Sequence, residues 1–241
     1  MDSSKFWELI KQEPDILNNS YANYKDVFDL AILAWDNFIT PTYFTDFKHM
    51  STPLSIYKTQ ADVAFKQAIT SVMMREYSQA IYNIRLGVEN IVIAIYCYAQ
   101  PEAALEFFKP EGSMDRKIRA AANKYLATTL PERSDRLKGL HKTCDEYGSH
   151  QSFSHAGRNF GFDEDNNSFN IMLIGEDSPH LAVGLTGITV GTMIEFYFAI
   201  TGLGGVDWIK VAPSTENTFR KILKDFEAIK IKYKHLWANL A

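Results

Sequence analysis

The sequence predicts an all-α protein: a multi-helix bundle with one small β-hairpin insertion near residues 159–173. Apolar residues recur at spacings of three and four over most of the chain, as on helices that face a core. Residues 86–98 are apolar on nearly every side, which is typical of a buried central helix. The 241 residues, 46% of them hydrophobic, suit a single helical domain over residues 1–241 with a sizeable core.

The N-terminal part, residues 1–55, is expected to hold two helices and an aromatic loop. Helical spacing predicts a short helix over residues 2–12, which Pro14 interrupts, and a second helix over residues 15–39. The second helix stops near Pro41 because the residue before a proline avoids the helical region. Residues 40–54 are rich in aromatic side chains and prolines, which indicates a loop.

The middle part, residues 56–158, is expected to form the core. Residues 57–99 predict a long helical region with a break near Met73, and Pro101 follows its end. A short helix over residues 102–108 and a helix over residues 113–128 come next. A further helix is expected over residues 131–147, with Gly148 as its stop signal.

The C-terminal part, residues 159–241, is expected to hold the hairpin and two helices. Residues 159–162 and 168–173 alternate or run apolar, and the residues between them favour turns, which is the pattern of a hairpin. Helices resume at Pro179 and again after Pro213. The last helix shows the clearest periodicity, with apolar residues at Phe219, Ile222, Leu223, Phe226, Ile229 and Tyr233.

Cysteine content and the N-terminus favour a cytoplasmic protein. Two cysteines are too few for a secreted disulfide framework, and the acidic N-terminus does not resemble a signal peptide. Residues 181–206 carry one acidic residue, Glu195, and are long enough to cross a bilayer. A core helix of a soluble bundle explains this stretch and is the favoured interpretation, so a membrane partner is not expected.

Charge is distributed unevenly along the chain. The net charge is −4, yet residues 113–142 hold eight basic and three acidic residues, a local net charge of +5. Clustered cations of this kind can bind phosphates, and the candidate binding residues are Arg116, Arg119 and Lys124. The alternative is that these helices simply present solvated outer surfaces, and the acidic pI of 5.9 favours it.

Residues 145–158 form an unusually polar stretch. They contain two histidines, three serines, two acidic residues and an arginine, and His141 lies just before them. Because histidine transfers protons near neutral pH, His150 and His155 are candidate catalytic residues. The alternative is a polar connector between a helix and the hairpin.

Known cofactor and metal motifs are absent from the sequence, so neither a cofactor nor a metal is expected. There is no HExxH motif, no CxxC pair, and no glycine pattern for a nucleotide. Cys144 is expected on the buried side of its helix, where a thiol is inert.

Arg85 and Glu89 stand one helical turn apart at the start of the most apolar helix. At this spacing they can pair, and a buried charge has to pair. A pair that fastens the bundle is the favoured interpretation, while contact between Arg85 and residues 149–155 is the alternative.

The chain resembles a broad set of bacterial helical proteins related to HEPN domains, over roughly residues 60–160. The resemblance rests on an arginine and a glutamate before an apolar run and on a later helix that leads into a Tyr-x-Ser-His segment. The residues concerned are Arg85, Glu89, Tyr147, Ser149, His150 and His155. Arg136 and His141 also match the Arg-x4-His spacing of HEPN ribonucleases, although Leu137 stands where the family is often polar.

This resemblance implies an all-α bundle that often dimerises. In active members the paired arginine and histidine converge at the dimer interface and cleave RNA without a metal, through the 2′-hydroxyl. Here His141 would act as the acid or base, and Arg136 would steady the phosphate charge.

The function expected from the resemblance is RNA binding or RNA cleavage in bacterial stress or phage defence, in a homodimer or with a protein partner. A non-catalytic interaction or structural module is the alternative, because many relatives have lost catalysis.

Overall fold

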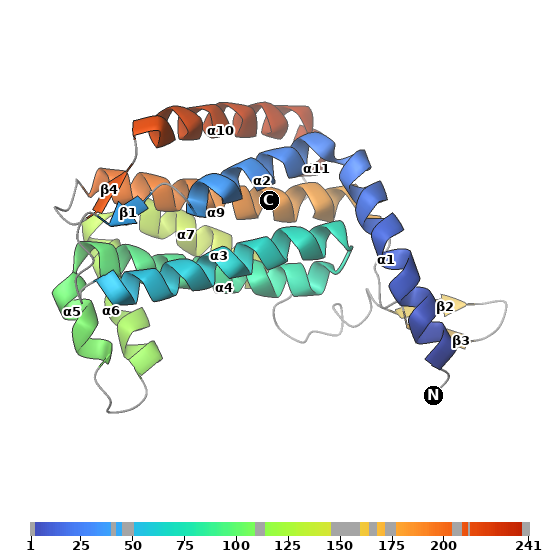
Figure 1. The fold of residues 1–241 in the computed structure, drawn as a ribbon, viewed down its shortest axis with the longest axis horizontal. Helices are drawn as coiled ribbons and strands as arrows, with labels where there is room; N and C mark the ends of the chain where they lie inside the picture. The colour runs from blue at the N-terminus through green and yellow to red at the C-terminus, as the bar shows by residue number, and fades with distance from the viewer. Residues whose placement is uncertain are drawn as a thin grey trace.

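The computed structural model describes nine segments of the chain. These are residues 3–39, 42–44, 51–108, 114–145, 160–163, 168–171, 177–203, 209–211 and 213–237. They form a multi-helix bundle, as predicted (Figure 1). One continuous hydrophobic cluster of buried side chains runs through the bundle from α2 to α10.

The centre of the bundle is a pair of long helices, α3 (Ser51–Met73) and α4 (Tyr77–Ala99) (Figure 1). The chain turns between them close to the predicted break, and Arg75 in this turn adopts a φ of 60°. The two helices approach closely at Gly87, where an added Cβ would lie 2.3 Å from the ring of Phe65. A glycine is therefore required at this crossing.

The long apolar helices are buried as the sequence indicated. Almost all of α4 after Val88 lies in the core, and so does most of α9 (Pro179–Gly202), which starts at Ser178 with a side-chain cap. The hydroxyls of Thr189 and Thr192 donate to backbone carbonyls one turn earlier, which satisfies these polar groups inside the core.

Both α4 and α9 have the length and hydropathy of a membrane span. Their most apolar windows are 78% and 89% buried by neighbouring helices. The core helix of a soluble bundle meets the same criterion of length and hydropathy.

The prediction that Pro14 interrupts the first helix is wrong. Pro14 lies inside α1 (Ser3–Asn23) and does not end it, because one proline removes a single backbone hydrogen bond from a stretch that is largely exposed. The chain instead breaks before α2 (Lys25–Ile39), at Tyr24. There the Tyr24 hydroxyl donates to Asp177 at 3.1 Å, which ties the break to the residues before α9.

The next four helical elements that the structure describes after α4 are short or of medium length. They are α5 (Pro101–Leu105), the 3-10 helix η1 (Glu106–Phe108), α6 (Met114–Thr129) and α7 (Pro131–Cys144). α6 and α7 are joined at Leu130, and both pack against α4. The backbone N–H of Asp145 donates to the last turn of α7, and residues 146–147 of the predicted helix lie outside the described residues.

The C-terminal helix α10 (Pro213–Lys232) forms an outer layer over α2 and α9, and α11 (Lys234–Trp237) continues it (Figure 1). The ring of Phe219 stacks on Tyr197 of α9, with centroids 3.9 Å apart. The Lys232 ammonium and the Tyr233 hydroxyl both donate hydrogen bonds to the carboxylate of Asp26 in α2, at 2.7 Å and 3.0 Å.

Four short strands complete the described elements. β1 (Thr42–Phe44) lies within the stretch that the sequence indicated as an aromatic loop, and it pairs antiparallel with β4 (Ile209–Val211). β2 (Phe160–Asp163) and β3 (Ser168–Ile171) also pair antiparallel. Residues 164–167 lie outside the described residues, so the hairpin insertion as a whole stays a prediction.

Candidate anion-binding site

A cavity of about 340 Å³ lies between α4, α6 and α7. Four buried apolar side chains line part of it: Val88, Val92, Leu126 and Leu137. Polar and charged side chains line the rest, and they include Lys138 and Lys142 of α7. The cavity therefore combines an apolar wall with a charged one.

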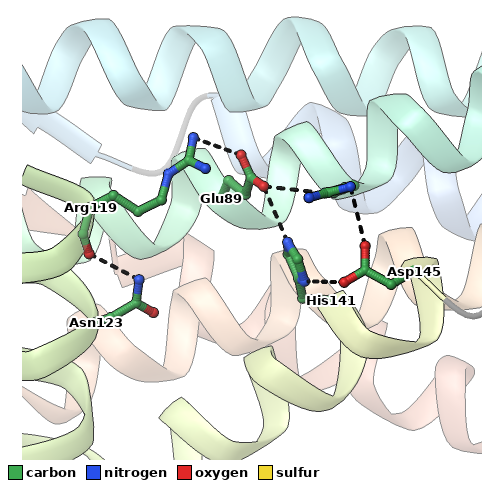
Figure 2. Close-up of polar contacts among 6 residues, drawn as sticks. Glu89, Arg119, Asn123, His141 and Asp145 are labelled. Atoms are coloured by element: carbon green, nitrogen blue, oxygen red, sulfur yellow. Dashed lines mark hydrogen bonds and ion pairs between the residues drawn. The ribbon is translucent and has the colours of Figure 1, made fainter. Parts of the chain in front are cut away.

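The charged wall is organised around Glu89. Its carboxylate forms an ion pair with Arg119, whose Nη2 lies 2.8 Å away, and accepts a hydrogen bond from Arg85 Nε at 3.3 Å. It also meets Nε2 of His141 at 3.2 Å (Figure 2). One carboxylate thus contacts two arginines and an imidazole, which come from three helices.

A second carboxylate, Asp145, completes what we call the Glu89 network, made of Arg85, Glu89, Arg119, His141 and Asp145. Asp145 lies 3.1 Å from His141 Nδ1 and 3.2 Å from Arg85 Nη1. His141 therefore has a carboxylate at each ring nitrogen (Figure 2). A neutral imidazole donates through only one nitrogen, so both contacts become hydrogen bonds only when the ring is protonated.

The contacts around Glu89 keep it ionised. The hydrogen bond from His141 lowers the pKa of the Glu89 carboxyl, and the charges of Arg119 and Arg85 lower it further, while partial burial opposes them. Within the network, two arginines balance two carboxylates when His141 is neutral. The two lysines then give the lining of the cavity a net charge of +2.

Local sequence spacing places most of these side chains. Arg85 and Glu89 stand one turn apart on α4, and His141 and Asp145 stand one turn apart at the end of α7. The predicted Arg85–Glu89 pair is present, and Glu89 extends it to α6 and α7.

Arg136 takes no part in this network. Its Nη1 lies 3.1 Å from Glu195 of α9, which also accepts from Arg133 at 2.9 Å. Residues five positions apart on a helix point about 140° apart, so Arg136 faces α9 while His141 faces α4. Within one chain the structure does not bring the Arg-x4-His pair together.

The other predicted binding residues of α6 lie outside the cavity. Arg116 and Lys124 are exposed, as is Lys117, and none of the three forms an ion pair among the described residues. Arg119 lies on the same helix and lines the cavity with a side chain that is 47% exposed. α6 therefore carries cations both inside and beside the cavity.

Four predicted site residues, Tyr147, Ser149, His150 and His155, lie outside the described residues. The described segment that holds α7 ends one residue after the helix, at Asp145, which belongs to the Glu89 network. Among the described residues, no group of three or more histidines, cysteines or acidic residues is arranged to hold a metal ion.

Sequence reasoning missed Asn123, Ser134, Lys138 and Lys142 as cavity-lining residues. Their helices were predicted, but which of their faces meet α4 was not. Cys144 was expected to be inert, and it is buried, with burial raising the pKa of its thiol to about 12.

Comparisons of this chain with known protein families, with curated proteins and with solved structures find no match.

Proposed function

We propose that the protein binds RNA at the cavity between α4, α6 and α7, as a HEPN-like protein of bacterial stress or phage defence. The observation that carries this proposal is the convergence of Arg85, Arg119 and His141 on one cavity from three helices. Two of these were predicted as binding residues and one as the catalytic histidine.

The chemistry of the cavity suits a phosphate group. Guanidinium groups bind phosphate oxygens through paired hydrogen bonds, and the lysines add positive charge at the same lining. The exposed cations Arg116, Lys117 and Lys124 continue along α6, where they suit the neighbouring phosphates of a strand. A polyanion therefore matches this surface better than a single small anion does.

His141 is placed to transfer a proton. Asp145 faces Nδ1, and a hydrogen bond there holds the tautomer in which Nε2 carries no proton, so Nε2 can accept one when Glu89 moves away from it. In cleavage, Nε2 takes the proton of the 2′-hydroxyl, the 2′-oxygen attacks phosphorus, and the 5′-oxygen leaves with a proton from water. The arginines then stabilise the charge that develops on the phosphate.

Arg136, which the Arg-x4-His spacing paired with His141, does not reach the cavity of its own chain. It is 58% exposed and paired with Glu195, on a different side of α7 from His141. A phosphate contact from Arg136 at the same RNA would therefore have to come from the second chain of a homodimer.

A non-catalytic interaction module is the second candidate. The observation in its favour is the internal charge balance of the Glu89 network, in which each arginine already has a carboxylate partner. In this second candidate, the whole role of the network is to hold α4, α6 and α7 together.

The test is incubation of 5′-labelled single-stranded RNA with the purified protein in EDTA, which limits cleavage to metal-independent chemistry. We compare the wild type with H141A, with R136A, and with the double variant of His150 and His155 to alanine. The proposal expects cleavage to be lost in H141A, with RNA still bound. Loss only in the double variant would move the chemistry away from this cavity, and absence of both RNA binding and cleavage in the wild type would favour the interaction module.

A further inference from the structure

Glu89 occupies the place on Arg119 that a bound phosphate needs. Its carboxylate lies 2.8 Å from Arg119 Nη2, and its side chain is only 14% exposed. The guanidinium that it holds is 47% exposed, so Arg119 is open to solvent on its other side. An anion that approaches this cavity therefore meets a cation whose inner partner is already a carboxylate of the protein.

The partners of the three donors differ. Arg85 and His141 each contact Asp145 as well as Glu89. Among the described residues, Glu89 is the only ion-pair partner of Arg119. If Arg119 turns to another anion and Glu89 shifts, Glu89 keeps Arg85 and His141 keeps Asp145, so no cation of the network is left without a partner.

We propose that Glu89 is the specificity-determining residue of this cavity, and that an anion binds by replacing its carboxylate on Arg119. The identification of that anion as an RNA phosphate rests on the proposed function above. The exchange favours phosphate over carboxylate ligands. A carboxylate ligand offers Arg119 the same two oxygens that Glu89 already offers. A phosphate has further oxygens, which can accept hydrogen bonds from Lys138 and Lys142.

The same exchange frees His141. Nε2 of His141 faces Glu89 in the structure, so it is the nitrogen that becomes available when Glu89 shifts. Anion binding and exposure of the proton-accepting nitrogen are thereby linked through one carboxylate.

The experiment compares the affinity of inorganic phosphate, acetate and a single-stranded RNA 12-mer for three proteins. They are the wild type, E89Q, and E216Q as a matched control, since Glu216 on α10 is a carboxylate paired with an arginine one turn away. Phosphate and acetate are measured by calorimetry, and RNA by fluorescence anisotropy. A double variant, E89Q with R119Q, tests whether the effect passes through Arg119.

We expect E89Q to bind phosphate and RNA about tenfold more tightly than the wild type, equivalent to about 1.4 kcal/mol. E216Q should match the wild type, the double variant should lose the gain, and acetate should bind none of the proteins measurably. E89D keeps the charge but shortens the reach to Arg119, so it should show a smaller gain and serves if E89Q does not fold.

Equal affinities for phosphate in the wild type and both Glu89 variants would overturn the exchange, and RNA binding by the wild type would still leave the proposed function in place. Tighter phosphate binding by E89Q without RNA binding by any protein would support the exchange and remove RNA as the ligand. A gain that persists in the double variant would show that it does not involve Arg119.

Discussion

His141 Nε2 lies 3.2 Å from Oε1 of Glu89, and this contact joins the end of α7 to the middle of α4. It belongs to a network in which two arginines, two carboxylates and an imidazole share one cavity. The stability and the ligand chemistry of this part of the bundle therefore depend on the same few charged groups.

The free energy of unfolding should fall at acid pH as the Glu89 carboxylate becomes protonated. The pKa of its carboxyl is lowered below the ordinary value of 4.5, so its ionised form stabilises the fold. That contribution is complete above about pH 4.5 and is lost as pH falls through the lower pKa of the folded protein. Urea unfolding between pH 6 and pH 3 should show a steeper loss of free energy for the wild type than for E89Q, and parallel curves would contradict this.

Gly87 should not tolerate a side chain. In G87A the new methyl group would lie 2.3 Å from the ring of Phe65, so α3 and α4 would have to separate or the buried ring to move. We expect a loss of about 1–3 kcal/mol in the free energy of unfolding.

Gly139 provides the matched control, because an added Cβ there meets nothing within 4 Å. G139A should be neutral or stabilise α7 by up to about 1 kcal/mol, since alanine favours the helix. The two changes are compared by urea denaturation, and equal effects would contradict the close helix contact.

Removing Glu195 should cost more free energy of unfolding than removing one of the arginines that pair with it. E195A removes a carboxylate of a residue that is 8% exposed and leaves two arginines without it, so we expect a cost of about 1–3 kcal/mol. R136A removes an arginine that is 58% exposed and should cost less than about 1 kcal/mol. Thermal and urea denaturation measure both, and a larger cost for R136A would contradict the assignment.

The two thiols should be inert in the folded protein. Cys97 and Cys144 are buried, and burial raises the pKa of each thiol to about 12. A thiol-reactive dye at pH 8 should label neither cysteine until a denaturant is added. Rapid labelling of the native protein would show that one of the two lies in an open environment.

Much of the helical fold could be predicted from local signals. α4 was expected in the core because it is apolar on nearly every side, and α9 was expected to start at Pro179. Pro14 was misleading because an exposed helix tolerates one missing hydrogen bond. The pairing of β1 with β4 was not predicted, since each strand has only three residues and they lie far apart in the sequence.

The site could be predicted only in its local pieces. The Arg85–Glu89 pair follows from spacing on a single helix. The convergence of Arg119, Glu89 and His141 depends on how α6 and α7 pack against α4, and periodicity within one helix does not specify that packing. For the same reason spacing alone does not place Arg136 and His141: within one chain the helix points them to different neighbours, and their convergence across a dimer interface stays a prediction.

Binding of RNA phosphates by this cavity is tested most directly by the salt dependence of RNA binding in R119Q and R220Q. Both arginines pair with a glutamate, but Arg119 lines the cavity and Arg220 lies on α10. Fluorescence anisotropy in EDTA over a series of salt concentrations gives the affinity and its salt dependence for each variant. We expect at least tenfold weaker binding for R119Q, a reduction of about 0.7 in the slope of log affinity against log salt, and wild-type values for R220Q. Unchanged affinity and slope in R119Q would contradict RNA binding at this cavity.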